Sequence, residues 1–249
     1  MLISLRGEEK VGKSHFSATA PTPIVVFNLD GGFQRCLGSF PALKTIVVEG
    51  KELAEALKTP ADIYIVEYYL DFPSLTTIDA KNPFGKGLKI SPIYTQFLQN
   101  IEMAVRNPAV KTLVFDTGTV WWEIARSAFK EKAGSDGMMA RDYGTVNAEV
   151  RAVFNFVKAA EKRGMEKNLI TLHHNKDIYV ADKATGDTMA DGCKHVGKFV
   201  DVKLRMTKDK KEGKIVTTTE IEDCGLNRTV EGKKLANLTF EKLQELAEL

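Results

Sequence analysis

The chain contains few cysteines and no long apolar run. Its three cysteines lie far apart and none belongs to a C-x-x-C pair, which argues against a zinc knuckle and against a disulfide framework. No apolar stretch approaches the roughly 20 residues needed to cross a bilayer, and no signal-peptide pattern precedes the first apolar segment. We therefore expect a cytoplasmic protein with free thiols and no membrane partner.

The sequence also lacks an excess of charge of one sign. Its 35 basic and 33 acidic side chains leave a formal net charge of +2, which neither requires nor excludes a nucleic-acid partner. The hydrophobic content of 43% is ordinary for a soluble globular protein. At 249 residues without internal repeats, the chain can bury the core of one α/β domain. We predict a single domain over residues 1–249.

The most specific motif is a phosphate-binding loop near the start of the chain. Residues 7–14 read Gly-Glu-Glu-Lys-Val-Gly-Lys-Ser and fill every fixed position of G-x-x-x-x-G-K-[ST]. In such a loop, Lys13 reaches the β- and γ-phosphate oxygens of a nucleotide and the Ser14 hydroxyl ligates Mg²⁺. The alternative is a glycine-containing surface turn. The predicted nucleotide-binding residues are Gly7, Glu8, Glu9, Lys10, Val11, Gly12, Lys13, Ser14 and His15.

Short apolar runs alternate with segments of helical periodicity, which predicts an α/β fold with a mainly parallel sheet flanked by helices. Buried strands are expected at residues 1–5, 23–29, 44–48, 63–69, 111–117 and 168–172. Helices are expected at residues 12–19, 52–57, 93–106, 121–132, 146–163 and 240–249. Loops are expected at residues 71–92, 133–144 and 181–198. Residues 200–207 and 214–221 are predicted to pair as a C-terminal β-hairpin across the charged turn 208–214.

Polar residues follow three of the predicted strands, and ligands bind at the carboxyl ends of strands in parallel sheets. Asp116 follows an apolar strand, as a magnesium-binding carboxylate would, and would hold the ion through water or Ser14; the alternative is a helix N-cap. Asp30 is the candidate catalytic carboxylate, or else a turn residue before Gly31-Gly32. Residues 173–175, His-His-Asn, are candidate γ-phosphate sensors, although both histidines of an extended chain cannot face the same way.

Together these motifs resemble the RecA-like NTP-binding proteins of phages. The resemblance rests on the phosphate loop, on Phe27 to Gly32, on Leu113 to Thr117 and on Thr171 to Lys176, in that order along the chain. It implies a RecA-like P-loop NTPase core over about residues 1–205, followed by the hairpin and helix of residues 206–249. It also implies ATP and Mg²⁺ as cofactors and assembly into a ring or filament, with ATP bound between identical subunits.

The resemblance further implies roles for individual residues. The catalytic residues would be Lys13, Asp30, Asp116 and His174, and the metal ligands would be Ser14 and Asp116. Loops 133–145 and 181–198 fall where RecA-like proteins contact single-stranded DNA, and the DNA phosphates there would contact Arg141, Lys194 and Lys198. The implied protein is a phage or prophage ATPase, in a bacterial host cell, that acts on single-stranded DNA in recombination, annealing or replication.

Other functions stay open on the residues themselves. Glu8 and Glu9 lie within the phosphate loop, and the Asp30 side chain is one methylene shorter than the glutamate that could stand there. Both features favour a nucleotide-gated assembly module with little turnover and no DNA binding. A small-molecule kinase usually has an arginine-rich lid late in the chain, where only two arginines occur. Arg205, Lys208 and Arg228 are either trans-acting contacts to a neighbour's nucleotide or solvated strand ends. We interpret the segment with Cys193 and His195 as a loop, because two ligands do not make a metal site.

Overall fold

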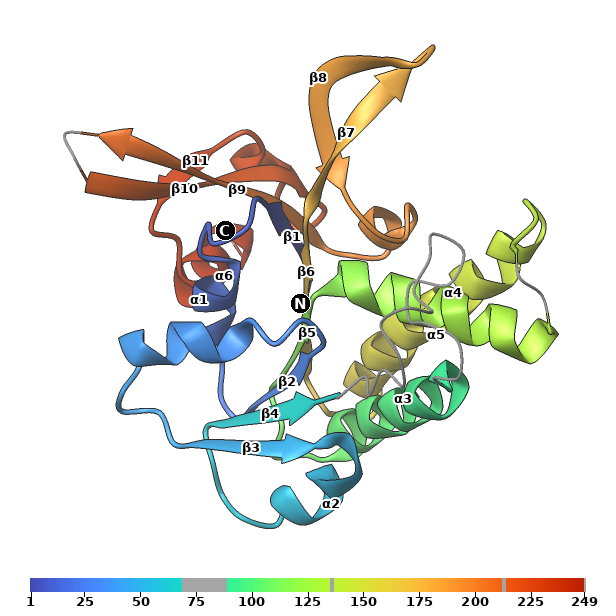
Figure 1. The fold of residues 1–249 in the computed structure, drawn as a ribbon. Coiled ribbons are helices and arrows are strands. Elements are labelled where there is room, and N and C mark those ends of the chain that lie inside the picture. Colours follow the sequence, from blue (N-terminus) through green and yellow to red (C-terminus); the bar gives the residue numbers. More distant parts are fainter. Residues whose placement is uncertain (69–88, 135–136, 212–213, 249) are drawn as a thin grey trace.

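A nine-stranded sheet forms the centre of the molecule (Figure 1). The computed structural model describes residues 1–68, 89–134, 137–211 and 214–248. The strand order across the sheet is β11-β10-β9-β1-β6-β5-β2-β4-β3. Its strands are β1 (Leu2–Gly7), β2 (Ile24–Asn28), β3 (Thr45–Glu49), β4 (Ile63–Glu67), β5 (Thr112–Asp116), β6 (Asn168–His173), β9 (Val202–Lys211), β10 (Lys214–Cys224) and β11 (Lys234–Ala236).

Most of the sheet is parallel. Every neighbouring pair from β9 across to β3 is parallel, whereas β10 pairs antiparallel with both β9 and β11. The α/β fold, with a mainly parallel sheet and a C-terminal hairpin, is therefore confirmed. Because β1, β2, β5 and β6 run in the same direction, their carboxyl ends meet at one edge of the sheet.

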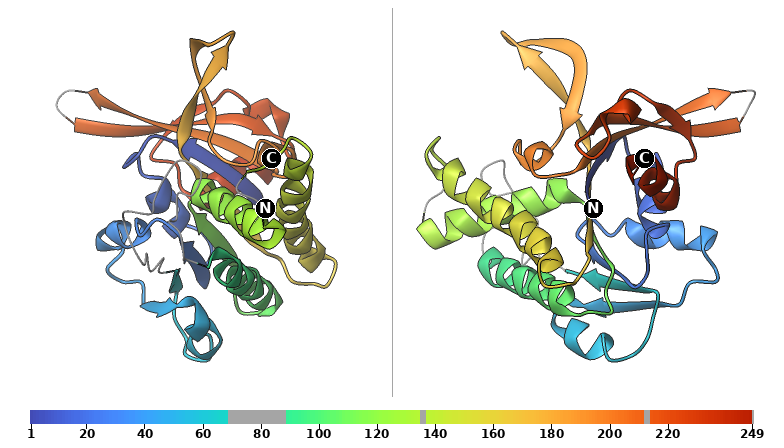
Figure 2. Two further views of the ribbon diagram at one scale, coloured as in Figure 1. Left: turned by 45° about the vertical axis from the view of Figure 1, so that its right-hand side comes forward. Right: turned by 180° about the vertical axis from the view of Figure 1, so that it is seen from behind.

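Helices cover both faces of the sheet (Figure 2). One face packs against α3, α4 and α5, and the other packs against α1 and α6. The helices are α1 (Lys13–Ala18), α2 (Leu53–Ala56), α3 (Ile90–Arg106), α4 (Gly118–Ala133), α5 (Asp142–Glu161) and α6 (Phe240–Glu248). Short 3-10 segments lie at Phe33–Ser39, Gly50–Glu52, Val196–Lys198 and Arg228–Val230.

Alternate side chains of the central strands enter two separate hydrophobic cores. Phe27 and Phe115 point toward α3 and α4, whereas their neighbours Val26 and Val114 point to the other face. The ring of Phe97 on α3 has its centroid 5.3 Å from that of Phe27 and 5.5 Å from that of Phe115. This aromatic packing fixes β2 and β5, and with them the polar residues at their carboxyl ends.

A second, two-stranded sheet stands away from the body of the molecule (Figures 1 and 2). It consists of β7 (Asn175–Val180) and β8 (Lys183–Ala190), paired antiparallel. The prediction of a loop over residues 181–198 is therefore wrong for most of that range. The outcome is a β-hairpin whose side chains are largely exposed, so its strands lack the apolar alternation from which a strand is usually predicted.

Other boundaries also differ from the predictions. The 3-10 segment at 33–39 and the short strand β11 were not predicted, and α3, α4 and α5 each begin three or four residues earlier than predicted. Predictions at residues 69–88, 135–136, 212–213 and 249 lie outside the described residues. Within the described ranges, no helix combines the length and the apolar character needed to span a bilayer.

Candidate nucleotide-binding site

The loop that joins β1 to α1 curves tightly beside β9. β1 ends at Gly7, where a Cβ atom would lie only 2.6 Å from the carbonyl oxygen of Met206 on β9. Gly12, directly before α1, has a φ of 107°, which is a left-handed conformation that favours glycine. The Thr217 hydroxyl on β10 donates a hydrogen bond to the Val11 carbonyl oxygen at 3.2 Å. The curved loop expected from the motif is present, and strand packing as well as loop geometry requires glycine at position 7.

Lys13 is buried at the centre of this loop. Its side chain is 7% exposed, and its Nζ donates to the carbonyl oxygens of Gly7 at 2.8 Å and Glu8 at 2.6 Å. Burial lowers the pKa of Lys13, because the ammonium loses hydration, while the carboxylates of Asp116 and Asp30 act in the opposite direction. Two neutral carbonyls are its only hydrogen-bond partners in the described structure, so the ammonium can also bind an anion.

Ser14 and Asp116 form the second part of the site. The Ser14 hydroxyl donates to Oδ2 of Asp116 at 2.8 Å, and Asp116 is only 3% exposed. Burial, followed by the charge of Asp30, raises the pKa of Asp116 to about 7; Ser14 and Lys13 oppose this shift. Thr117, and not Asp116, caps α4 by accepting a hydrogen bond from the Val120 amide. The Asp116 carboxylate is therefore directed at Ser14, and the pair offers the oxygen ligands that Mg²⁺ prefers.

A cavity of about 550 Å³ lies over these residues. It brings together most of the residues predicted for the site, while Glu8 faces solvent outside it and Gly7 contributes its carbonyl to Lys13. The predicted residues that line it are Glu9, Lys10, Val11, Gly12, Lys13, Ser14, His15, Asp30, Asp116 and His174.

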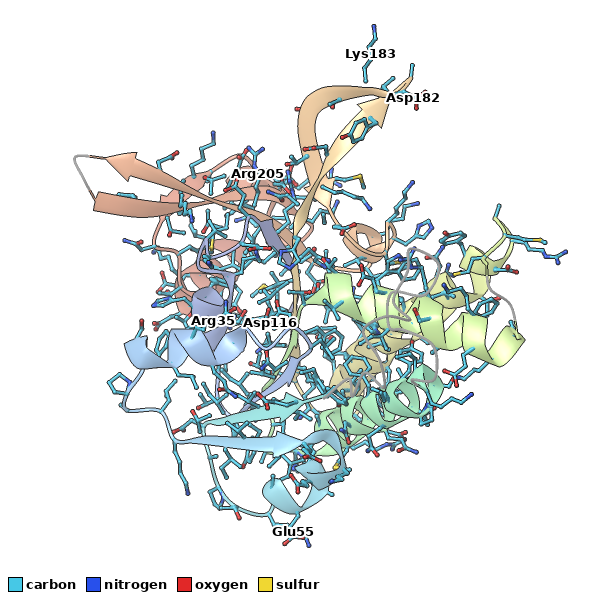
Figure 3. All side chains as sticks on the ribbon, in the orientation of Figure 1. Arg35, Glu55, Asp116, Asp182, Lys183 and Arg205 are labelled. Atoms are coloured by element: carbon cyan, nitrogen blue, oxygen red, sulfur yellow. The ribbon has the colours of Figure 1, made fainter. Side chains whose placement is uncertain are left out.

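Four further residues line the cavity: Gly32 and Thr117 belong to motifs quoted from the sequence, whereas Arg35 and Cys36 were missed. Arg35 and Cys36 lie on the 3-10 segment 33–39, and Figure 3 labels Arg35 beside Asp116. The only signal for this segment was the four-residue spacing of Phe33 and Leu37, which suits one helical turn. Arg35 is exposed and adds a third cation, after Lys10 and Lys13, to the wall of the cavity.

Asp30 combines both interpretations made from the sequence. Its Oδ1 accepts a hydrogen bond from the Gly32 amide at 2.8 Å, as expected of a turn residue. The residue also lines the cavity and is solvent-exposed, and its charge acts on both Lys13 and Asp116. The turn thus holds a solvent-exposed carboxylate on the wall of the cavity.

The two adjacent histidines point to different environments. His173 is buried against Gly118, and its Nδ1 lies 2.9 Å from the carbonyl oxygen of Asp191. Burial lowers the pKa of His173 to about 4. His174 is half-buried and lines the cavity, and its backbone amide donates to the Thr119 hydroxyl at 3.2 Å. Of the two, only His174 reaches the cavity.

Comparison with known protein families identifies the family of this chain. Residues 1–229 match the model of an AAA domain family, AAA_24. The chain belongs to this family. Membership supports a P-loop NTPase domain and suggests nucleotide binding. No curated protein sequence matches the chain.

Solved structures also resemble this AAA domain. One is a KaiC-like protein, PH0186, from the hyperthermophilic archaeon Pyrococcus horikoshii OT3. The two chains are 14% identical, with a TM-score of 0.47, over 94% of this chain and 84% of the other.

The residues predicted to contact DNA lie outside the cavity. Arg141 is highly exposed beside Asp142, with Nε 3.8 Å from Oδ1, and Lys194 and Lys198 are exposed after the β7–β8 hairpin. Cys193, directly before Lys194, is buried, and its thiol donates to Oδ1 of Asn147 on α5 at 3.3 Å. Across the described residues, no group of three or more His, Cys, Asp or Glu side chains is arranged to hold a metal ion.

The three cations considered as trans-acting contacts differ in their surroundings. Arg205 on β9 forms ion pairs with Glu220 and Glu222 of β10. Lys208 is exposed further along β9. Arg228 follows the end of β10, and β10 ends opposite the beginning of β9, so Arg228 lies at the edge of the sheet away from the phosphate loop.

Proposed function

We propose that this AAA domain binds ATP together with Mg²⁺ at the phosphate loop and hydrolyses it. The observation that carries the proposal is the buried ammonium of Lys13 next to the 2.8 Å hydrogen bond between Ser14 and Asp116. Lys13 would hold the β- and γ-phosphate oxygens, and Ser14 and Asp116 would hold the metal. When bound, Mg²⁺ neutralises the charge that develops on the phosphate oxygens during transfer to water.

The chemistry of the residues fits such a ligand. A buried ammonium without a carboxylate partner is costly unless an anion can approach it, and the adjoining cavity gives an anion room to do so. Asp116 is buried with its pKa raised to about 7, so a cation at this position would favour its ionised form.

The remaining polar groups have roles consistent with hydrolysis. Asp30 is solvent-exposed on the wall of the cavity, where it would orient a water molecule and accept its proton. His174 lines the same cavity and would contact the γ-phosphate, and exposed Arg35 would add positive charge.

We further propose that the ATPase acts on single-stranded DNA in recombination, annealing or replication, as a homo-oligomeric ring or filament encoded by a phage or prophage. The motif order along the chain supports this proposal. Exposed Arg141, Lys194 and Lys198 are available for contacts with DNA phosphates, which would make binding strongly dependent on salt.

The test is ATP hydrolysis with and without single-stranded DNA, in the natural chain and in Lys13→Ala and Asp30→Asn. Asparagine can still accept the hydrogen bond from Gly32, so Asp30→Asn removes the charge and preserves the turn. Lys58→Ala is the matched control, because Lys58 is an exposed lysine that forms an ion pair with Glu55, far from the site (Figure 3). We expect turnover that rises with DNA, is lost in both site variants and persists in the control.

A nucleotide-gated assembly module with little turnover is the second candidate. The observation that favours it is the engagement of Asp30 with the Gly32 amide, because this hydrogen bond competes with proton acceptance from water. Nucleotide binding without DNA-responsive turnover would overturn the recombination ATPase and support this second function.

A further inference from the structure

A second cavity, of about 430 Å³, lies against the opposite flank of the phosphate loop. It shares Lys10, Val11, Gly12 and His15 with the first cavity. Its other wall is built from β9, β10 and residues 237–239, which follow β11. Neither Asp30 nor Asp116 lines it. The phosphate loop therefore separates a polar cavity that contains the carboxylates from a second cavity that does not.

This arrangement suggests how a nucleotide would lie. If Ser14 and Asp116 hold the metal at the terminal phosphates, the rest of a linear triphosphate must extend away from Asp116. The second cavity begins on that side and shares four residues with the first. We propose that it receives the nucleobase of the bound nucleotide and that Asn237 selects adenine. This inference rests on the proposed nucleotide binding.

The walls of the second cavity suit a flat aromatic ring. Phe16, Met206 and Leu238 supply apolar surface and are themselves almost completely buried, so their positions are fixed by the core. A methionine sulfur packs favourably against aromatic rings. Small-molecule sites commonly combine such apolar walls with a few convergent polar groups.

Among the residues that line the second cavity but not the first, Asn237 is the polar group available for base recognition. Its backbone has a φ of 49°, and its amide N–H donates to the Thr217 carbonyl oxygen at 3.1 Å. Its side-chain amide makes no hydrogen bond with any described residue. The Thr217 hydroxyl already donates to Val11, and the Thr239 hydroxyl accepts from the Lys242 amide. The main chain thus fixes Asn237 in place while its side chain remains free.

A side-chain amide matches adenine better than guanine. Its carbonyl accepts from the N6 amino group and its NH₂ donates to N7, so both hydrogen bonds form at once. Guanine presents two acceptors, O6 and N7, along the same edge, and the amide carbonyl then lacks a donor. The geometry therefore points to a preference for ATP over GTP.

The test measures equilibrium binding of ATP, GTP and inorganic tripolyphosphate, each with Mg²⁺. Asn237→Gly removes the amide and tolerates the left-handed backbone, whereas alanine would add strain. Asn237→Asp keeps the shape, tolerates the same backbone and presents only acceptors, which suit the N1–H and N2 amino donors of guanine. Gln244→Ala is the control, because it also truncates an exposed amide in the C-terminal segment; among the described residues, the Gln244 amide donates to Glu248.

We expect Asn237→Gly to weaken ATP binding by about tenfold and to leave tripolyphosphate binding unchanged, since one bidentate base contact is lost. In Asn237→Asp, the ratio of ATP to GTP affinity should fall by at least about tenfold. The natural chain could bind tripolyphosphate while the ratio of ATP to GTP affinity is the same in all variants. That result would overturn the proposed nucleobase site in the second cavity and leave the proposed nucleotide binding intact. If the natural chain binds none of ATP, GTP and tripolyphosphate, both the proposed function and the proposed nucleobase site are wrong.

Discussion

The two β-hairpins late in the chain are attached to the molecule in opposite ways. The β9–β10 hairpin continues the central sheet, because β9 pairs with β1 from Ile3 to Gly7 and buries Val202, Leu204 and Met206. The β7–β8 hairpin pairs only with itself, and its tip residues Asp182 and Lys183 are the most distant from the body in Figure 3. One hairpin is held by core burial, and the other by polar contacts at its base.

Arg6 is the residue at which the two hairpins meet. It is 9% exposed, and its guanidinium donates to both carboxylate oxygens of Glu222 on β10. The same group donates to Oδ1 of Asn175 on β7 at 3.2 Å and to the Thr188 hydroxyl on β8 at 2.8 Å. Since Arg6 directly precedes Gly7, the base of the free hairpin is connected to the strand that leads into the phosphate loop.

The largest difference between the two hairpins should appear in the free energy at which their backbone hydrogen bonds open. Amides of β9 between residues 202 and 206 should exchange only when the whole domain unfolds, whereas β7 and β8 should open locally at a free energy lower by on the order of 5 kcal/mol. Native-state hydrogen exchange followed by mass spectrometry measures both. Equal protection of the two hairpins would contradict the contrast between burial and polar attachment.

The base of the β7–β8 hairpin should also be sensitive to acid. His173, before β7, bonds the carbonyl of Asp191, after β8, and its Nε2 is buried without a partner among the described residues. The pKa of His173 is lowered from 6.5 to about 4, so the unfolded chain binds more protons between these values. The free energy of unfolding should therefore fall by about 3 kcal/mol as pH drops from 6.5 to 4.

Chemical denaturation at several pH values measures this loss. The comparison is between the natural chain and His173→Gln, in which that part of the pH dependence should disappear. His174→Gln is the matched control, since His174 is the neighbouring, half-buried histidine. If the free energy of unfolding falls with pH equally in the natural chain and in His173→Gln, the base of the hairpin does not depend on a neutral His173.

Removing the shared anchor should have a smaller but clear effect. Arg6→Ala leaves Glu222, Asn175 and Thr188 without their common donor, and we expect a loss of about 2 kcal/mol in the free energy of unfolding. Hydrogen exchange should rise in β7 and β8 and stay low in residues 202–206. If Arg6→Ala lowers the protection against hydrogen exchange equally in both hairpins, Arg6 has no specific role in holding the β7–β8 hairpin.

The smallest effect is expected for Arg205→Ala. Arg205 also pairs with Glu220 and Glu222, but its side chain is 37% exposed, so solvent screens the interaction. We expect a change below about 1 kcal/mol in the same denaturation measurement. A loss as large as that from Arg6→Ala would mean that burial does not distinguish the two arginines.

The sequence predicted those features that local patterns encode. The phosphate loop has a fixed spacing, and buried strands such as β2 and β5 are continuous apolar runs. Strand β9 was predicted from its pairing with residues 214–221 across the charged turn, and its Val202, Leu204 and Met206 alternate with polar residues. Strand β8, Lys-Ala-Thr-Gly-Asp-Thr-Met-Ala, buries little apolar surface, so nothing in its pattern indicates a strand.

The composition of the cavity depends on contacts between distant segments. Arg35 and Cys36 reach it because a turn after β2 folds back over the phosphate loop, which no spacing in the chain reveals. The choice between His173 and His174 likewise depends on which side of β6 carries α4. The side-chain alternation of a strand predicts that the two differ, but not which one is buried.

The close approach of Gly7 to Met206 has a consequence for variation at this position. The first glycine of the motif is usually credited to the phosphates, yet here any side chain would collide with the main chain of β9. In a library that randomises position 7, most variants would therefore fail because β1 and β9 cannot pair, whatever their effect on nucleotide binding. At Gly12, where the nearest atom to a Cβ would lie 3.6 Å away, tolerance would instead depend on the left-handed backbone and on the space that a side chain takes from the two cavities.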